Sequence, residues 1–405
     1  MEATSKARQV LQVDSQPSDQ SRLLFLVTRS SQGDVPKAGA DLREDALIVG
    51  LRRILPTDVL AITDLHERSG CIDGCSQLTN QFCRIPGSDE THQWPYCASA
   101  DIALGKFLEE TSYAAVIVSH VPMHHFIRTV RRYVCTRVIV DLHNAEADLE
   151  EEMFNHPDYV ALRAPDAAQW SGMARVERVL QANADLVTIP SASDRTRLIR
   201  RYGNTSIAVV PNCVDVSGEF PNVEELTVRS CFFLGALEYF PNTQAGVNIA
   251  ERIGPAILHA MPWLQVIVAG RRPPSVLTAA CGASPVTLVP DVVDVSALFR
   301  NSILLVPLEC GGGTRLKILQ AFASGCPVIS TSKGMEGIDA QPGIHYVLAD
   351  DSDSFVDGVR KIVDQPADDL IRRKNAWALV CARYSWDSVV EPLRAALVTV
   401  GVPAI

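Results

Sequence analysis

Short apolar runs alternate with longer mixed stretches along most of the chain. After a polar start, the run "RLLFLVT" is bounded by turn residues, and similar runs follow at wide spacing: "DVLAIT", "YAAVIVS", "RVIVDLH" and "DLVTIPS". Runs of this kind are typical of parallel strands that are buried on both faces of a sheet. The stretches between them, such as residues 41–55, are long enough for helices. The pattern therefore predicts βαβ units around a parallel sheet.

The pattern begins again after "SIAVVPN", which ends at Asn212. The second series of apolar runs comprises "SCFFLGAL", "LQVIVAG", "VTLVP", "SILLVP" and "CPVIST". We therefore expect two doubly wound, Rossmann-like α/β domains that face a central cleft, where ligands bind at the carboxyl ends of the strands. The predicted divisions are a flexible leader (1–20), an N-terminal domain (21–212), a C-terminal domain (213–385) and a last helix (386–405) that packs back on the first domain.

Composition narrows the possible partners and the location. The 405 residues carry a formal net charge of -10, which argues against a surface for nucleic acids, because such surfaces concentrate Lys and Arg. The first 20 residues lack the apolar core of a signal peptide, and no segment offers the ~18 apolar residues that cross a bilayer. We expect a cytoplasmic protein whose eleven cysteines are reduced.

The segment "LECGGGTRLKILQAFASGCPVIS", residues 308–330, carries the main candidate site. Three glycines, Gly311–Gly313, follow a predicted strand, and glycine readily takes the positive φ values that turn successive amides toward an anion. A helix that begins near Thr314 adds its positive end. Arg315 and Lys317 place two cations beside these amides, as suits a diphosphate, and Gln320 can face the same cleft. A tight turn with solvated cations is the alternative, and it explains the glycines but not the clustering.

This segment, extended to "LECGGGTRLKILQAFASGCPVISTSKGMEGI", resembles the donor-site motif of the group 1 retaining glycosyltransferases, which are GT-B enzymes that use nucleotide-diphosphate sugars. "FFLGALEYFPN" resembles the start of that family's second domain, "VVPNCVD" its interdomain link and "RVIVDLHNAEAD" its first-domain active-site loop. The resemblance spans most of residues 137–340. It implies an acceptor-side first domain, a donor-binding second domain and no essential metal or other cofactor.

The resemblance also implies roles for individual residues. Gly311–Gly313, Thr314, Arg315 and Lys317 would bind the donor diphosphate, and Gln320 the nucleotide ribose. The family commonly carries two glutamates eight residues apart, where this chain has Gly312 and Gln320. An amide at position 320 still bonds ribose hydroxyls but carries no charge. For the family the favoured mechanism is a front-face displacement, in which the departing phosphate oxygen accepts the proton of the acceptor.

Four further candidates lie in the first domain. His143 and Asn144 follow the run "RVIVD", where they can meet the transferred sugar or the acceptor, or else cap the helix "NAEADLEEEMF". His120, after "AVIVS", has the same kind of position. Gly39 resembles the family's glycine loop that lets an acceptor or a phosphate approach the backbone, although a plain transition from loop to helix explains it as well.

For three other groups of residues we favour a structural role over a functional one. Cys71, Cys75, Cys83 and Cys97, with His92, offer zinc ligands, but their spacing matches no paired C-x-x-C arrangement and we expect no metal. Asp351 and Asp353 resemble the metal-binding carboxylates of another glycosyltransferase architecture, but we expect them to cap a helix. Two arginine-rich helices are expected to be solvated faces, with peripheral membrane contact as the alternative; their arginines are Arg128, Arg131, Arg132, Arg195, Arg197, Arg200 and Arg201.

The leading hypothesis is a retaining glycosyltransferase that moves a sugar from a nucleotide-diphosphate sugar to a hydroxyl of an unidentified glycan, lipid-linked sugar or small molecule. A GT-B epimerase or phosphorylase-like enzyme would use the same phosphate site without that acceptor. A non-catalytic protein that binds sugar nucleotides is the third hypothesis, which Gln320 makes conceivable. A NAD-dependent dehydrogenase is disfavoured, because no G-x-G-x-x-G follows an early strand.

Overall fold

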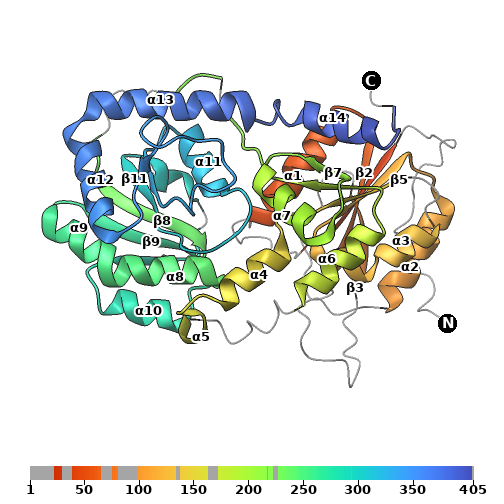
Figure 1. The fold of residues 1–405 in the computed structure, drawn as a ribbon, viewed down its shortest axis with the longest axis horizontal. Helices are drawn as coiled ribbons and strands as arrows, with labels where there is room; N and C mark the ends of the chain where they lie inside the picture. Colours follow the sequence, from red (N-terminus) through yellow and green to blue (C-terminus); the bar gives the residue numbers. More distant parts are fainter. Residues whose placement is uncertain are drawn as a thin grey trace, which may run out of the picture.

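The chain folds into two lobes that each contain one parallel sheet (Figure 1). The computed structural model describes residues 22–29, 39–64, 75–80, 98–133, 137–162, 172–216, 218–221, 227–292 and 294–403. The first lobe holds the strands before residue 210, and the second holds those after residue 229.

The first sheet has seven parallel strands in the order β3-β2-β1-β4-β5-β6-β7. Its strands are β1 (Leu23–Arg29), β2 (Thr57–Asp64), β3 (Cys75–Asn80), β4 (Ala115–Ser119), β5 (Arg137–Asp141), β6 (Leu186–Ile189) and β7 (Ile207–Val209). The central strand β1 explains the apolar runs. Leu24 and Leu26 enter the core on one face, and Phe25 and Val27 enter the core on the other. Both faces are therefore buried, as the sequence predicts.

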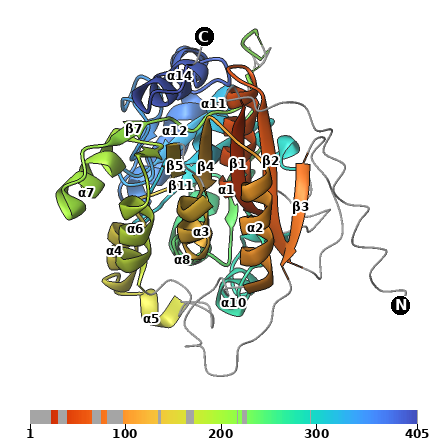
Figure 2. The same ribbon diagram turned by 90° about the vertical axis from the view of Figure 1, so that its right-hand side faces the viewer.

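Helices cover both faces of this sheet. The helical segments of this part of the chain are α1 (Gly39–Arg52), α2 (Ala98–Glu110), the 3-10 helix η2 (Val121–His125), α3 (Ile127–Tyr133), α4 (Glu146–Phe154), α5 (Tyr159–Leu162), α6 (Met173–Ala182) and α7 (Ala192–Tyr202). The short α5 packs on the second lobe instead of the sheet. Figure 2 shows α2, α3 and α6 in front of the strands, and their apolar side chains share one core. The other face is covered by α1 and by the last helix of the chain.

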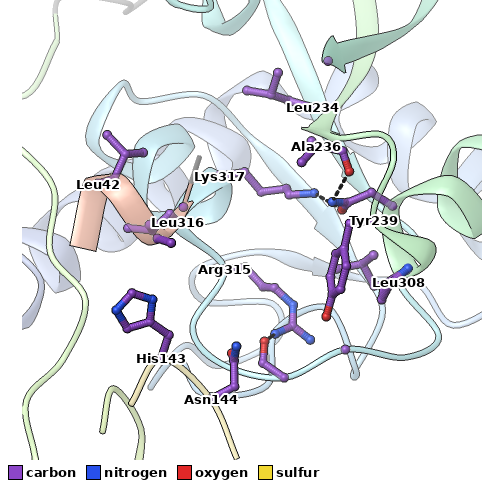
Figure 3. A pocket seen from close by; sticks show the side chains of 18 of the residues that line it. Leu42, His143, Asn144, Leu234, Ala236, Tyr239, Leu308, Arg315, Leu316 and Lys317 are labelled. Atoms are coloured by element: carbon purple, nitrogen blue, oxygen red, sulfur yellow. Dashed lines mark hydrogen bonds between the residues drawn. The ribbon is translucent and has the colours of Figure 1, made fainter. Parts of the chain in front are cut away.

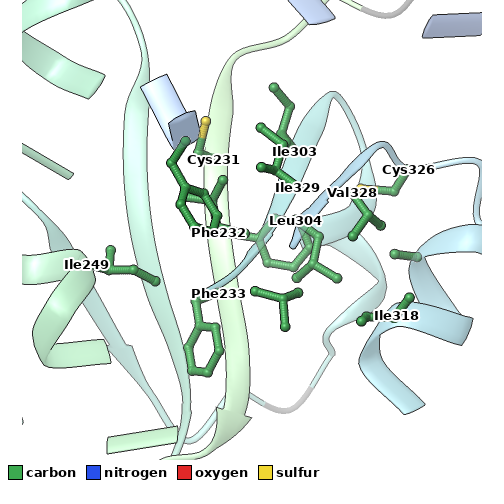
Figure 4. Packing of buried hydrophobic residues seen from close by; sticks show 14 of the residues in the cluster. Cys231, Phe232, Phe233, Ile249, Ile303, Leu304, Ile318, Cys326, Val328 and Ile329 are labelled. Atoms are coloured by element: carbon green, nitrogen blue, oxygen red, sulfur yellow. The ribbon is translucent and has the colours of Figure 1, made fainter. Parts of the chain in front are cut away.

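The second sheet has six strands in the order β10-β9-β8-β11-β12-β13. They are β8 (Ser230–Ala236), β9 (Gln265–Arg271), β10 (Thr287–Pro290), β11 (Ser302–Val306), β12 (Val328–Ser330) and β13 (Val347–Leu348). Figure 4 shows Phe232, Leu304 and Ile329 packed together in its core. The helical segments are α8 (Phe240–Asn248), the π-helical η4 (Ile249–Ile253), α9 (Gly254–Ala260), α10 (Ser275–Gly282), η5 (Ser296–Phe299), α11 (Leu316–Ala323), α12 (Ser352–Asp364), α13 (Pro366–Arg383) and α14 (Val390–Thr399).

The two sheets share one strand order, in which the first strand of each domain lies between its second and fourth. Thus β1 lies between β2 and β4, and β8 lies between β9 and β11. This order creates a crevice at the carboxyl ends of the central strands, where doubly wound sheets bind ligands. The predicted fold class, two doubly wound domains of the GT-B type, is confirmed.

The end of the chain crosses from the second lobe to the first. Helix α13 runs along the second lobe, and α14 lies on α1 of the first lobe (Figure 1). Leu393 and Leu397 of α14 are buried in the same core as Phe25. The helix begins at Val390, four residues after the predicted start at Trp386.

Candidate active site

A cavity of about 690 Å³ lies between the two domains, at the carboxyl ends of their central strands. The first domain contributes the start of α1 and the loops after β4 and β5. The second contributes the loops after β8 and β9, residues 310–312, 314 and 315, and the start of α11. Figure 3 shows His143 and Asn144 of the first domain on the side of the cavity near Arg315, with Lys317 and Tyr239 on the walls of the second. The cavity is large enough for a ligand the size of a sugar nucleotide.

The conformation of the glycine segment explains two of its three glycines. Gly311 has a φ of 127° and Gly313 a φ of 68°, in the left-handed region that favours glycine. A Cβ atom at Gly313 would also lie 2.1 Å from Oδ1 of Asn144 and 3.1 Å from the carbonyl oxygen of His143. The third glycine therefore lets the first-domain loop approach the backbone of the second domain.

Arg315 is folded back onto this segment. Its buried guanidinium group donates hydrogen bonds to the carbonyl oxygens of Gly312 and Gly313, the latter at 2.6 Å. Because a trans peptide group points its N–H opposite to its C=O, these bonds orient the amides of Gly313 and Thr314 away from the guanidinium group. None of the amides of residues 311–314 donates a hydrogen bond to the part of the chain that the structure describes. They are available to an anion.

Lys317 lies on the first turn of α11 and lines the same cavity. Its Nζ donates a 2.8 Å hydrogen bond to Oδ1 of Asn242 and lies 4.1 Å from the centroid of the Phe233 ring. Burial, and then the charge of Arg315, hold the pKa of Lys317 well below its usual value. Burial also lowers the pKa of Arg315.

Neither cation forms an ion pair with a carboxylate among the described residues. Arg315 bonds to backbone carbonyls and Lys317 to a side-chain amide. Taking charged groups out of water without a counter-ion is costly, so this wall favours the arrival of an anion. The expected clustering of the two cations at the glycine segment is thus present in three dimensions.

Thr314 and Gln320 also line the cavity. Asn212, in the link between the domains, donates a hydrogen bond of 3.3 Å to the carbonyl oxygen of Thr314. Helix α11 begins at Leu316 with Arg315 as its N-cap, two residues later than predicted. Gln320 therefore lies in the second turn and is half-buried.

His120 and His143 come together in the first-domain wall. Their rings are stacked, with centroids 4.1 Å apart and planes 3° from parallel. Burial lowers the pKa of both imidazoles, which favours their neutral forms. His120 has a φ of 68°, and its amide donates a 2.7 Å hydrogen bond to the carbonyl oxygen of Asp141.

Asp141 is the last residue of β5 and holds His120 and His143 in place. Its carboxylate forms a buried ion pair of 2.6 Å with Arg43 of α1, and its Oδ2 lies 3.5 Å from Nε2 of His143. Arg43 also donates to Oδ1 of Asn212 at 2.8 Å. The first-domain wall is therefore connected by hydrogen bonds to the link between the domains.

Glu146, which the sequence analysis did not single out, also lines the cavity. It is the first residue of α4 and only 1% exposed. Its Oε1 accepts a 2.8 Å hydrogen bond from Nδ2 of Asn144, whereas its buried Oε2 has no hydrogen-bond partner in the described structure. Burial, opposed by the Asn144 bond and aided by the charge of Glu177, raises the pKa of Glu146 to about 8.

The alternative role of Asn144 as a helix cap is wrong. The N-cap of α4 is Ala145, which makes no side-chain cap bond. Glu177 of α6 accepts from the amides of Glu146 and Ala147 instead, and so fills the capping role from another helix. Asn144 is left to contact Gly312, Gly313 and Glu146.

Gly39 is the first residue of α1 and lines the cavity, but its conformation does not demand glycine. A Cβ atom there would meet Cδ1 of Leu316 at 3.6 Å, which is an ordinary contact. The contact shows that the start of α1 lies against the start of α11 across the cleft.

The remaining candidates lie elsewhere or outside the described residues. Cys71, Cys83, Cys97, His92 and the side chain of Cys75 are outside them. In the described part, no three His, Cys, Asp or Glu residues form a group that could hold a metal ion. Asp351 is confirmed as a cap: it forms a capping box with Ser354 at the start of α12, and Asp353 lies in the first turn.

The arginines of α7 largely face partners. Arg200 and Arg201 pair with Asp148, and Arg201 also pairs with Glu151. Membrane contact through the arginine-rich helices stays a prediction. Among the described helices, none has the length and apolar character needed to span a bilayer.

Comparison with known proteins agrees with this geometry. The family model "Glycosyl transferases group 1" matches residues 229–365, which include β8 to α12 and the glycine segment. No curated protein sequence matches the chain significantly.

Solved structures share the fold over nearly the whole chain. Sucrose-phosphate synthase from Thermosynechococcus elongatus is 15% identical, with a TM-score of 0.65 over 92% of this chain and 97% of its own. HepE from Anabaena in complex with UDP-glucose is 14% identical, with a TM-score of 0.67 over 93% and 99%. A glycosyltransferase from Rickettsia africae is 9% identical, with a TM-score of 0.63 over 94% and 99%. At these identities the likeness is one of fold.

The family match covers the domain that contributes the glycine segment, Arg315 and Lys317. The fold of the whole chain is that of two-domain GT-B enzymes. Residues 229–365 are thus similar to the group 1 glycosyltransferases, and the described chain shares the fold of these solved structures.

Proposed function

We propose that the protein is a retaining glycosyltransferase that transfers a sugar from a nucleotide-diphosphate sugar to a hydroxyl group of an acceptor. One observation carries this proposal. Arg315 is buried and Lys317 is half-buried, and neither has a carboxylate partner in the described structure; both lie beside unused amides in the wall of an interdomain cavity. A diphosphate can pair with both cations and accept hydrogen bonds from the unused amides.

The leaving group explains why such a wall promotes transfer. As the bond between the anomeric carbon and the phosphate oxygen breaks, negative charge develops on the diphosphate and the sugar becomes oxocarbenium-like. The amides of Gly313 and Thr314 and the ammonium group of Lys317 stabilise that charge in place. Arg315 contributes in two ways, because it adds positive charge and it holds the loop carbonyls so that the amides face the ligand.

The first-domain wall then receives the sugar and the acceptor. Neutral His120 and His143 and the amide of Asn144 offer hydrogen bonds without adding charge near the departing diphosphate. The carboxyl group of Glu146 has a pKa of about 8, and a protonated carboxyl is a poor nucleophile. This supports a front-face displacement, in which a phosphate oxygen of the leaving group accepts the proton of the acceptor hydroxyl. No metal is required, since the cations of the protein balance the diphosphate.

Nucleoside diphosphate release from a panel of nucleotide sugars, with and without candidate acceptors, tests the proposal. The wild-type protein should release nucleotide faster with the right acceptor, and the product should keep the anomeric configuration of the donor. Arg315→Ala and Lys317→Ala should each lower kcat/KM by about 100-fold or more, as for loss of a group that stabilises a developing anion.

Arg360→Ala and Lys361→Ala are the matched controls, because both residues are exposed on α12 and outside the cavity. They should leave turnover unchanged. Folded Arg315 and Lys317 variants with full activity would contradict the assignment. Acceptor-independent conversion of the sugar nucleotide to an epimer, or binding without turnover, would favour another function.

A further inference from the structure

Glu146 is a buried carboxyl group with one oxygen satisfied and the other not. Oε1 accepts from Asn144, and Oε2 has no hydrogen-bond partner in the described part of the chain although it is shielded from water. The residue lines the interdomain cavity. A buried polar atom of this kind is destabilising unless a water molecule or a ligand completes its hydrogen bonding.

The groups around Glu146 do not supply a cation to balance an ionised carboxylate. Glu150 of its own helix, Glu177 of α6 and Asp194 of α7 add negative charge. Nδ1 of His120 lies 4.0 Å from Oε1, and burial lowers the pKa of this imidazole. Tyr239, from the second domain, is close enough to have its own pKa raised by burial and by Glu146. No Lys or Arg pairs with Glu146 among the described residues.

Asn144 fixes where this carboxyl group lies relative to the donor site. The same side chain donates to Glu146 and touches the backbone of Gly313, where a Cβ atom would overlap its Oδ1. Glu146 is therefore one side chain away from the amides that we assign to the diphosphate. A sugar attached to that diphosphate must occupy the adjacent space in the cavity.

We propose that Glu146 acts as a neutral acid whose Oε2 donates a hydrogen bond to an oxygen of the transferred sugar. This inference rests on the proposed function, because it presupposes a sugar nucleotide in the cavity. Oε1 is occupied as an acceptor by Asn144, so the proton resides on Oε2, the oxygen that lacks a partner. A negative carboxylate at this place would repel the departing diphosphate, whereas a neutral one does not.

The hydrogen bond is present only while Glu146 carries its proton. Its pKa is about 8 in the free protein, chiefly through burial. Binding of the sugar nucleotide and its activity should therefore decline as the pH rises through this value. Glu146→Gln keeps the same pattern at every pH, because Oε1 of the amide accepts from Asn144 and its NH2 group donates to the sugar.

The test compares nucleotides with and without a sugar, using UDP, GDP, UDP-glucose and GDP-mannose as probes in titration calorimetry from about pH 6.5 to 9.5. Glu146→Ala should bind the sugar nucleotide about 10-fold more weakly than wild type at neutral pH, which corresponds to one hydrogen bond. It should bind the matching nucleoside diphosphate within about twofold of wild type. Glu146→Gln should match wild type at neutral pH and bind the sugar nucleotide more tightly above pH 8.

Glu150→Gln is the control for a general loss of buried negative charge. Glu150 is a buried acid on the same helix, with Oε2 bonded to the amide of Met173, and it does not line the cavity. This variant should show wild-type affinity for both kinds of probe. Thermal unfolding of all variants verifies that they are folded.

Three results would overturn the inference. If Glu146→Gln fails as badly as Glu146→Ala at neutral pH, the ionised carboxylate is what matters. If both variants weaken UDP and UDP-glucose equally, or GDP and GDP-mannose equally, Glu146 supports the site without contacting the sugar. If wild type binds none of the probes, the proposed function itself fails, and the inference fails with it.

Discussion

Replacing Lys317 with Met removes the charge of the side chain but keeps most of its packing. The variant therefore tests whether this wall of the cavity binds an anion. Methionine is unbranched and of similar length, so it can keep the contact with Phe233. The ammonium group loses its 2.8 Å hydrogen bond to Asn242 and its position over the Phe233 ring. Each of these interactions is worth about 1 kcal/mol, and relief from burying a cation offsets them. We therefore expect the free energy of unfolding to change by no more than about 2 kcal/mol.

The effect on the ligand should be far larger. An ammonium group and a phosphate charge about 4 Å apart attract each other by about 4 kcal/mol at an effective dielectric constant of 20. If half of this is lost to screening and relaxation, Lys317→Met binds a nucleoside diphosphate about 30-fold more weakly.

Proton uptake gives a sharper readout of the same group. Burial and Arg315 lower the pKa of Lys317 in the free protein, and a bound diphosphate raises it again. Between the two values, binding takes up close to one proton per site, and the affinity falls by up to about tenfold per pH unit as the pH rises.

Calorimetric titration with UDP or GDP, in buffers with different heats of ionisation, measures the uptake. Wild type should show a heat that depends on the buffer, and Lys317→Met should lose that dependence. Equal affinities and buffer-independent heats for both proteins would show that Lys317 does not bind the diphosphate.

Two further predictions concern the packing and the buried acids. Gly313→Ala should destabilise the protein more than Gly343→Ala. Both residues have positive φ, so alanine costs about 1–2 kcal/mol at either position, but only at Gly313 would its Cβ atom overlap Asn144. Equal losses of unfolding free energy in chemical denaturation would contradict that contact. Burial is the main cause that raises the pKa of Glu146 from 4.5 to about 8 and that of Glu177 from 4.5 to about 7. The stability that these acids provide is therefore complete below pH 4.5 and is lost as the pH rises through their pKa values in the folded protein. The loss is up to about 1.4 kcal/mol per pH unit for each group. The free energy of unfolding should depend less steeply on pH in Glu146→Gln than in wild type. An unchanged dependence would contradict the raised pKa of Glu146.

The fold was accessible from the sequence because burial on both faces of a sheet forces continuous apolar runs, as in β1. The glycine segment was accessible for a local reason as well, since a tight turn alone accounts for three glycines but not for the two cations that follow them. What the sequence did not show is why the third glycine is needed. The reason is the approach of Asn144 from the other domain, which depends on how the two domains meet.

Two functional features of the site lie in side-chain directions that no motif encodes. The sequence places Arg315 at the site but not its return to the carbonyls of Gly312 and Gly313. Glu146 belongs to a run of acidic residues, and the charge of that run does not reveal which of its residues turns its carboxyl group inward. Its spacing does carry a signal, because Glu146 precedes Leu149 and Met153 by three and seven residues and so shares the buried face of α4.

A crystal structure with UDP or GDP bound would show whether the glycine segment and Lys317 hold the diphosphate. We expect diphosphate oxygens within hydrogen-bond distance of the amides of Gly313 and Thr314, and Nζ of Lys317 turned from Asn242 toward a phosphate. A nucleotide bound outside the interdomain cavity, or a diphosphate that touches neither the glycine segment nor Lys317, would contradict this expectation.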